Sequence, residues 1–317
     1  MSQTQTPGLR AYIRIARPDH WIKNLFILPG SLLAFLLAGW DAGLWTLLIH
    51  LVLGFLCTCC VASANYVINE WLDAEFDRFH PTKKNRPVVA GGMKGRLVAL
   101  DYLFWAVLGL TVAAMLSRWV LAMEVWLLVM GLLYNVKPIR TKDVVYLDVL
   151  SESINNPIRL LIGWFLVTQT ALPPSSIVVG YWFGGAFLMA VKRFAEYRMI
   201  GDPQRAGLYR RSFKRYTEQS LLVSSVFYAM VSSFMLGVFM IKYKIELILA
   251  LPFLFGLFCY YLKLAFKDDS VVQKPEKLYH EKGLLLYVLV LFAIGVALLF
   301  LKLPWLDALL TTELIGL

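Results

Sequence analysis

The sequence predicts an all-α integral membrane protein, a nine-transmembrane-helix bundle with a polar cavity that faces the cytoplasm. Hydrophobic residues fill 59% of its 317 positions, and the mean hydropathy of +0.65 lies far above that of ordinary soluble domains. Nine apolar windows have about the length that crosses a bilayer, near residues 24–40, 44–68, 97–117, 119–134, 146–170, 176–197, 220–241, 245–264 and 284–302. We treat 1–317 as a single membrane domain, with a cytoplasmic N-terminal segment over 1–20 and an interfacial C-terminal tail over 303–317.

Basic residues predict the orientation of these helices, because cytoplasmic loops carry an excess of Lys and Arg. Of the 31 Lys and Arg residues, the odd-numbered connections and the C-terminal tail hold only Arg118, Lys242, Lys244 and Lys302. We therefore expect a multi-pass protein of the cell inner (plasma) membrane whose N-terminus and active site face the cytoplasm. This topology accounts for the net charge of +10, and no recognition helix or basic tail indicates a nucleic-acid partner.

Cysteine and histidine do not indicate a metal centre. Cys57, Cys59 and Cys60 fall in one apolar window and Cys259 in another, so we expect all of them to be small buried packing residues. The four His residues are scattered along the chain, and none has a second His or Cys at the spacing typical of zinc ligands.

The end of the second window carries a regular polar motif. Amide and carboxylate side chains recur there every four residues, at Asn65, Asn69, Asp73 and Asp77. Each four-residue step turns a helix by only about 40°, so these side chains share one broad face. Their oxygens suit Mg²⁺, which proteins usually hold together with substrate phosphates. Because the basic stretch 80–87 follows at once, we predict a magnesium and diphosphate site; the alternative is a solvated acidic helix end.

A second polar stripe lies in the fifth window, after Tyr134 and Lys142. Its members share one narrow side of a predicted helix and are Asp148, Glu152, Asn155 and Arg159. An Arg within a membrane span is costly and by default functional or paired, so we expect the stripe to face a cavity. The alternative is a network within the helix, in which Asn155 and Glu152 neutralise Arg159.

A third polar cluster follows the sixth window. Lys192, Arg193 and Glu196 lie three or four residues apart, so one helical turn can present an ammonium, a guanidinium and a carboxylate together. We expect these three residues to belong to a site. The basic stretch 205–215 is explained equally well by cytoplasmic topology and by binding of anionic lipid headgroups.

Taken together, these motifs resemble the UbiA superfamily of membrane prenyltransferases. The resemblance covers nearly the whole chain and rests on Asn65-x3-Asn69-x3-Asp73-x3-Asp77, the Arg86-Pro87 and Gly91-Gly92 turn, and Tyr134-x3-Pro138-x-Arg140-x-Lys142-x5-Asp148. It implies a UbiA-like bundle of nine helices whose two Asp-rich motifs hold a diphosphate through Mg²⁺.

Finer features resemble one branch of that superfamily, the decaprenyl-phosphate phosphoribosyltransferases. They are Arg17-Pro18-x2-Trp21-x-Lys23-Asn24, His80-Pro81-Thr82-Lys83, and Lys192-Arg193-x-Ala195-Glu196 leading to Tyr216-Thr217. Enzymes of this branch move a 5-phosphoribosyl group from phosphoribosyl diphosphate (PRPP) onto a polyprenyl phosphate lipid. Two features depart from the branch: Glu70 stands where Asp is usual, and residues 135–142 resemble the superfamily more generally.

The assignments follow from chemistry common to the superfamily. Prenyl and phosphoribosyl transfer both expel diphosphate from a carbon that becomes cation-like, and Mg²⁺ neutralises the leaving group. We predict Asp73, Asp77 and Asp148 as catalytic residues. The predicted metal ligands are Asn69, Glu70, Asp73, Asp77, Asp148 and Glu152. The predicted substrate-binding residues, chiefly cations for phosphate, are Lys23, Asn65, Lys83, Arg86, Tyr134, Lys142, Arg159, Lys192, Arg193 and Glu196.

Two other functions fit the same sequence. A UbiA-type enzyme could instead move a prenyl group from a polyprenyl diphosphate to an aromatic acceptor. A non-enzymatic transporter or lipid-binding membrane protein could use acidic stripes for ions, although no internal repeat supports it. The discriminating feature is the surplus of Lys and Arg, because PRPP and a polyprenyl phosphate each bring a phosphate that an aromatic acceptor lacks.

Overall fold

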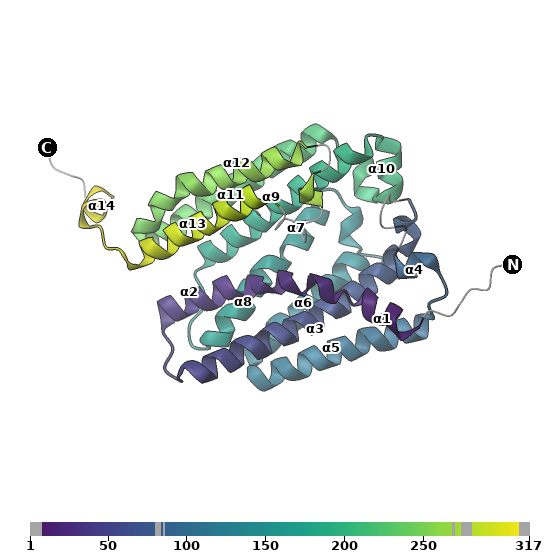
Figure 1. Ribbon diagram of the computed structural model, residues 1–317, viewed down its shortest axis with the longest axis horizontal. Helices are drawn as coiled ribbons and strands as arrows, with labels where there is room; N and C mark the ends of the chain where they lie inside the picture. The colour runs from purple at the N-terminus through teal and green to yellow at the C-terminus, as the bar shows by residue number, and fades with distance from the viewer. Residues whose placement is uncertain (1–7, 80–83, 85, 268–269, 274–280, 311–317) are drawn as a thin grey trace. The chain divides into compact units, whose positions relative to one another are not determined.

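The computed structural model describes residues 8–79, 84, 86–267, 270–273 and 281–310, and every regular element among them is a helix (Figure 1). The predicted all-α class is therefore confirmed. The chain divides into two compact units, the first comprising Met1–Pro173 with Ile200–Ser220 and the second Pro174–Met199 with Leu221–Leu317.

The first unit is built around the long helix α3 (Leu44–Asp77), which packs against α5 (Gly95–Leu116), α6 (Arg118–Asn135) and α8 (Asn155–Val167). Apolar side chains from these helices, among them those of Val61 and Ile158, form its buried core. The unit also contains shorter helices, namely α1 (Leu9–Ile15), η1 (Pro18–Ile27), α2 (Leu28–Ala38), α4 (Pro87–Ala90), η3 (Thr141–Asp143), α7 (Leu147–Ser153), α10 (Pro203–Tyr209) and η4 (Arg211–Lys214).

Helices α2 and α8 touch at the level of the backbone. A Cβ atom at Gly163 would lie 1.9 Å from the carbonyl oxygen of Ile27, and one at Gly30 would lie 1.9 Å from that of Leu160. The Ser31 hydroxyl donates a hydrogen bond of 2.9 Å to the Gly163 carbonyl across the same contact. This close approach fixes the N-terminal helices of the chain against α8, on which Arg159 lies.

Eight helices in the described part of the chain are long and apolar enough to cross a membrane, so the predicted count of nine is not confirmed. Eight predicted windows coincide with these helices. The fifth window, near 146–170, instead falls on α7 and α8, which are separate short helices. Pro157 accounts for the interruption, because proline has no N–H to donate to the carbonyl of Ser153 and its ring disfavours a continuous helix there.

The second unit contains the long helices α9 (Ser175–Ile200), α11 (Glu218–Tyr243), α12 (Leu251–Ala265) and α13 (Lys282–Phe300), with the short elements η5 (Ile245–Ala250), η6 (Val271–Gln273) and α14 (Pro304–Leu309). Its helices are joined by aromatic contacts, such as Phe187 with Phe258 at a centroid distance of 4.7 Å. A hydrogen bond of 2.8 Å from Ser232 to the Gly180 carbonyl links α11 to α9.

The cysteine prediction is correct for three positions and wrong for the fourth. Cys57, Cys59 and Cys60 are buried in α3, whereas Cys259 on α12 is exposed. An apolar window in a membrane protein does not separate the side of a helix that packs against protein from the side that faces lipid. The location of Cys259 in an apolar window was therefore insufficient to predict burial.

Candidate active site

The polar end of α3 extends beyond the thickness of a bilayer core. With 34 residues, the helix is roughly 51 Å long at 1.5 Å per residue, whereas the hydrocarbon core measures about 30 Å. Its last turns, which carry Asn69, Asp73 and Asp77, can therefore reach the interface with water. This is where a soluble, highly charged ligand can meet groups held by membrane helices.

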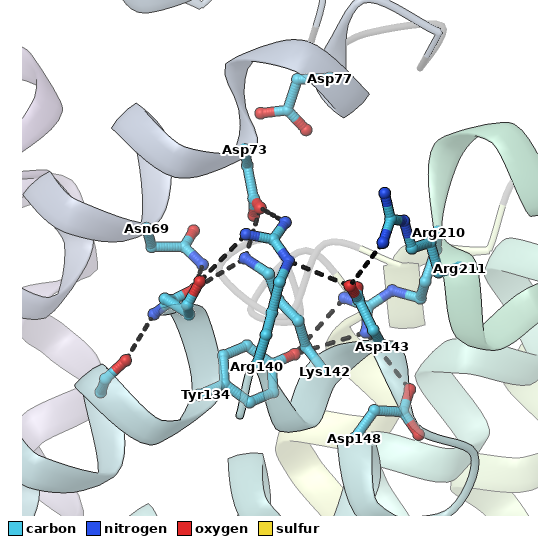
Figure 2. A network of polar contacts seen from close by, with 12 residues as sticks. Asn69, Asp73, Asp77, Tyr134, Arg140, Lys142, Asp143, Asp148, Arg210 and Arg211 are labelled. Carbon is cyan, nitrogen blue, oxygen red and sulfur yellow. Dashed lines mark hydrogen bonds and ion pairs between the residues drawn. The ribbon is translucent and has the colours of Figure 1, made fainter. Parts of the chain in front are cut away.

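Asp73 lies at the centre of a charged network that joins α3 to η3 (Figure 2). Its Oδ1 atom accepts a hydrogen bond of 3.0 Å from Arg140 and a second one from Lys142. Lys142 also donates to the side-chain oxygen of Asn135 at 2.7 Å, and Asn69 donates to the same oxygen at 2.6 Å. Figure 2 shows Asp73 pointing from α3 toward Arg140 and Lys142, so two of the residues predicted from separate motifs do meet.

Both cations of this network are buried, at 5% exposure each. Burial lowers the pKa of the Lys142 ammonium to about 8, against the opposing influence of the Asp73 carboxylate. Arg140 adopts a left-handed backbone conformation with φ of 31°, which is uncommon for a non-glycine residue and costs on the order of 1–3 kcal/mol. Its guanidinium also bonds the Asn135 carbonyl at 3.0 Å and lies 3.2 Å from Asp143, and these contacts hold the strained residue in place.

Asp77 pairs with a different cation. Arg86, just before α4, donates a hydrogen bond of 2.6 Å to Asp77, and its Nε atom lies 4.0 Å from the Glu70 carboxylate. Glu70 and Asp77 are both buried. Glu70 therefore lies on the Arg86 side of α3, and its other oxygen, Oε1, has no hydrogen-bond partner among the described residues. The structure brings the predicted substrate residue Arg86 directly to the predicted metal ligands.

Asp148 on α7 is held by a segment that is distant in sequence. It is fully buried, and it accepts hydrogen bonds from Tyr216 at 2.7 Å, Ser212 at 3.1 Å and Arg210 at 3.2 Å. In the same region the Tyr134 hydroxyl donates to Glu152 at 2.7 Å. Asp148 and Glu152 thus face protein donors at the end of the bundle, close to the network of Asp73.

The predicted site missed several members of this network. Asn135, Asp143, Arg210 and Ser212 were not assigned to a site, and Tyr216 was noted only as part of a resemblance. A signal was present for Arg210, which falls in the basic stretch 205–215. That stretch was equally compatible with lipid headgroups, because nothing in the sequence shows that α10 and η4 return to α3 and η3.

Three other predicted residues, Lys23, Arg159 and Asn65, contact η1, α8 and α6. Lys23 contacts His20 at 2.8 Å on η1. Arg159 donates to the Asn24 side chain at 2.9 Å and to the Asn155 carbonyl at 3.0 Å, so it is tied to η1 as well as to its own helix. Asn65 donates to the Leu127 carbonyl at 2.9 Å and packs against α6, which gives it a clear role in helix packing.

The cluster from the sixth window lies in the second unit. Arg193 and Glu196 are buried in α9 and form an ion pair of 3.0 Å. The predicted meeting of a guanidinium with a carboxylate on one turn is therefore seen. The role of Lys192, Arg193 and Glu196 in substrate binding stays a prediction, and Lys83 lies outside the described residues.

The oxygen donors on α3 suit a magnesium ion that is bound together with substrate phosphates. Within the described ranges, no group of three or more His, Cys, Asp or Glu side chains is placed to hold an ion. Mg²⁺, however, commonly takes one or two carboxylates and completes its shell with water and substrate phosphates. Both cationic contacts of Asp73 go to Oδ1, and a carboxylate offers about four lone-pair sites. Asn69, Asp73 and Asp77 therefore fit a metal that arrives with a diphosphate.

Comparison with known proteins identifies the family to which the chain belongs. The model of the UbiA prenyltransferase family matches residues 26–283. The decaprenyl-phosphate phosphoribosyltransferase of Mycolicibacterium smegmatis is 30% identical over 224 residues, 66% of this chain and 63% of its own length, which is less than two thirds of that relative. The protein of the same name from Mycobacterium tuberculosis is 32% identical over 222 residues, covering 69% of this chain and 70% of the relative.

Solved structures show the same fold. A UbiA homologue from Archaeoglobus fulgidus, bound to DMAPP and Mg²⁺, superimposes with a TM-score of 0.68. The match covers 92% of this chain and 99% of that chain, at 20% sequence identity. The helical arrangement is therefore similar over nearly the whole chain, although most of the residues differ.

Proposed function

Because the chain belongs to the UbiA prenyltransferase family, we propose that it is a magnesium-dependent transferase that moves the 5-phosphoribosyl group of PRPP onto a polyprenyl phosphate and releases diphosphate. The resemblance inferred from the sequence motifs is confirmed by the family match and by the relatives named decaprenyl-phosphate phosphoribosyltransferase. The proposal goes further than the family, since it specifies donor, acceptor and metal.

The choice of PRPP as the donor rests on the number of cations that contact the acidic side chains. Each of the predicted catalytic carboxylates contacts at least one Arg or Lys, and the cations involved are Arg86, Arg140, Lys142 and Arg210. Arg211 lies 3.7 Å from Asp143 beside them. PRPP carries a diphosphate and a 5-phosphate, and the acceptor lipid carries another phosphate. These ligands need more cationic donors than a prenyl diphosphate with an aromatic acceptor.

The ion pairs suggest how the site accepts its donor. Asn69, Asp73 and Asp77 would hold Mg²⁺, which supplies neutralisation of the diphosphate as it leaves C1 of the ribose. Arg140 and Lys142, which contact Asp73, would donate to phosphate oxygens. On binding, Asp73 would exchange its contacts with Arg140 and Lys142 for a contact with Mg²⁺, and the two cations would contact phosphate oxygens instead. No buried charge would then be left uncompensated.

The acceptor needs little activation. A phosphate monoester is already anionic near neutral pH, so the attacking oxygen requires no strong general base. Tyr134 and Glu152, joined by a hydrogen bond of 2.7 Å, would orient ribose or phosphate groups. We place Lys192, Arg193 and Glu196 at the 5-phosphate, the ribose or the acceptor, and the active site on the cytoplasmic side of the plasma membrane, in agreement with the distribution of Lys and Arg.

The test is a transfer assay with purified protein in detergent. Radiolabelled PRPP is incubated with Mg²⁺, with and without a C50 or C55 polyprenyl phosphate, and label is measured in the lipid phase. We expect lipid-bound label that disappears with EDTA and with the Asp77→Asn variant. Asp41→Asn, which removes an exposed carboxylate from the loop before α3, is the matched control and should stay active.

The same assay can overturn the proposal. Absence of label with every polyprenyl phosphate tested, together with product from a prenyl diphosphate and an aromatic acid, would assign the chain to aromatic prenyl transfer. Binding of metal without release of diphosphate from either donor would favour a transport or lipid-binding role.

A further inference from the structure

The carboxylate of Asp148 on α7 receives protein donors on both of its oxygens. Its Oδ1 atom accepts a hydrogen bond from the Tyr216 hydroxyl, and its Oδ2 atom accepts from Ser212 and Arg210. All three donors belong to residues 200–220, the connection between α9 and α11. The side chain of Asp148 is fully buried, with 0% exposure. Its bonding capacity is therefore directed to this connection and away from solvent.

Such an environment does not fit a magnesium ligand. Mg²⁺ demands nearly octahedral geometry and usually keeps several waters, so a carboxylate that binds it needs an accessible oxygen. The Asp73 side chain meets this need, because it is 20% exposed and receives both of its cationic contacts on Oδ1. An ion at Asp148 would instead displace existing hydrogen bonds. It would also lie beside the Arg210 guanidinium, which is 3.2 Å from the carboxylate, and the two positive charges would repel each other.

The Tyr216 hydroxyl joins Asp148 to the start of α7. It accepts a hydrogen bond of 2.6 Å from the Tyr146 N–H while it donates to the Asp148 carboxylate. Tyr146 has a positive φ of 64°, which is uncommon for a bulky residue and persists only where the surrounding structure specifies it. The two tyrosine rings meet edge-on at a centroid distance of 5.5 Å, and Phe213 beside them is buried. These contacts hold the connection in place before any ligand arrives.

Arg210 carries the charge of this connection toward the network of Asp73. Its guanidinium lies between Asp148 and Tyr134, and its Nη1 and Nη2 atoms are 3.4 Å and 3.5 Å from the Tyr134 hydroxyl (Figure 2). The Lys142 ammonium lies over the Tyr134 ring, 5.6 Å from its centroid, and donates to Asp73. Besides burial, the charge of Arg210 lowers the pKa of Lys142. The Arg210 side chain is 14% exposed, so a ligand at the Asp73 network can reach it.

We propose that Asp148 is a positioning residue, which aims Arg210 at a phosphate oxygen of the bound diphosphate and does not itself bind Mg²⁺. The proposal rests on the proposed function, because the donor's diphosphate is the anion that Arg210 meets. A guanidinium presents its donors in a rigid fork that suits phosphate oxygens, and the Asp148 carboxylate fixes the direction of that fork. Asp148 thereby receives a role different from the predicted one of metal ligand, and the metal is left to the residues of α3.

Equilibrium dialysis tests both halves of the proposal without relying on turnover. The full chain in phosphatidylcholine nanodiscs is dialysed against labelled diphosphate and radiolabelled Mn²⁺, which shares the preference of Mg²⁺ for oxygen ligands. The bound ions per chain and the diphosphate affinity are measured. The variants are Asp148→Asn, Arg210→Gln, Arg210→Lys and the double variant Asp148→Asn with Arg210→Gln. Asp77→Asn is the reference for loss of a metal ligand, and Arg205→Gln, which removes an exposed cation from α10, is the matched control.

We expect Arg210→Gln to weaken diphosphate by about 10- to 100-fold, the size of a lost charge-assisted hydrogen bond, and Arg210→Lys to recover part of this loss. Asp148→Asn should also weaken diphosphate, yet at saturating diphosphate it should bind as many Mn²⁺ ions per chain as the wild type, whereas Asp77→Asn should bind fewer or bind them more weakly. The double variant should resemble Arg210→Gln alone, because both changes remove the same contact. Arg205→Gln should behave as wild type.

Other outcomes would overturn the proposal. A loss of bound Mn²⁺ in Asp148→Asn like that of Asp77→Asn would make Asp148 a metal ligand. Unchanged diphosphate affinity in Arg210→Gln or in Asp148→Asn, or losses that multiply in the double variant, would show that Asp148 does not act through Arg210. The double variant removes both charges of the buried pair, so it supplies the ion count if Asp148→Asn does not fold. The proposed function fails separately, if diphosphate binds as expected but no phosphoribosyl group is transferred to any lipid phosphate.

Discussion

Replacing Asp73 with Asn tests whether the acidic face of α3 is also the electrostatic support of the site. The change preserves the shape of the side chain but removes the charge that Arg140 and Lys142 share. Both cations are buried. Removing one partner of a buried ion pair typically costs about 3–5 kcal/mol, because the remaining charge has no compensation. We therefore expect a loss of about 3 kcal/mol in the free energy of unfolding, besides loss of activity.

The pH dependence of that loss follows from Lys142. In the wild type its pKa of about 8 lies below its usual 10.5, so the unfolded chain holds this proton more tightly and stability rises between pH 8 and 10.5. Without Asp73 the pKa falls further, because the charge that opposed the effect of burial is gone. The rise then starts at lower pH. The cost of Asp73→Asn should shrink between pH 6 and 8, by about 1.4 kcal/mol per unit of lowered pKa.

The assay is unfolding in mixed micelles by titration with sodium dodecyl sulfate, followed by Trp fluorescence at pH 6 and pH 8. The double variant Asp73→Asn with Lys142→Met should recover part of the lost stability at pH 6, since the buried ammonium is gone and Arg140 keeps its ion pair of 3.2 Å with Asp143. Asp41→Asn again serves as the exposed control. A loss for Asp73→Asn no larger than about 0.5 kcal/mol at both pH values, typical of a surface substitution, would refute the reasoning.

Three further predictions concern separate parts of the first unit. Tyr216→Phe removes a hydrogen bond of 2.7 Å to the buried carboxylate of Asp148; it should lower stability by about 1–3 kcal/mol in the same unfolding assay, and an unchanged midpoint would contradict this. The kcat/KM for PRPP should fall above pH 8 as Lys142 loses its charge, and Lys142→Arg should abolish that decline if Lys142 is its cause. Gly163→Ala would place a Cβ atom 1.9 Å from a backbone oxygen of η1 and should destabilise strongly, whereas Gly295→Ala, with nothing within 4 Å, should not.

Much of the fold could be predicted from hydropathy, because each membrane span must be a long apolar helix that satisfies its own backbone. Eight of the predicted windows correspond to such helices. The exception at α7 and α8 has a local cause in Pro157, which cannot donate a backbone hydrogen bond to Ser153. A window average does not register a single missing hydrogen bond.

The candidate site could be predicted only in part. The spacing of Asn69, Asp73 and Asp77 specifies a common helical face, and that face carries the network in the structure. Which cation meets which acid depends instead on contacts between distant segments, such as Arg210 with Asp148. Local periodicity contains no information on such contacts, so the sequence could indicate that cations were needed without identifying the pairs.

The paired state of the acids leads to one more expectation about ligands. Mg²⁺ alone must compete with Arg140 and Lys142 for Asp73, and diphosphate alone must compete with Asp73 for the same cations. Each ligand by itself would leave one partner of a buried pair uncompensated, whereas the two together replace both.

Ligand that binds only the folded state raises stability by RT ln(1 + [L]/Kd). The unfolding midpoint should therefore rise more with Mg²⁺ and diphosphate together than the sum of their separate effects. Asp73→Asn should reduce this excess, because the carboxylate that exchanges its partners is missing. Strictly additive shifts in the wild type would mean that metal and diphosphate bind independently, and would exclude exchange of the Asp73 ion pairs as the way in which the donor is admitted.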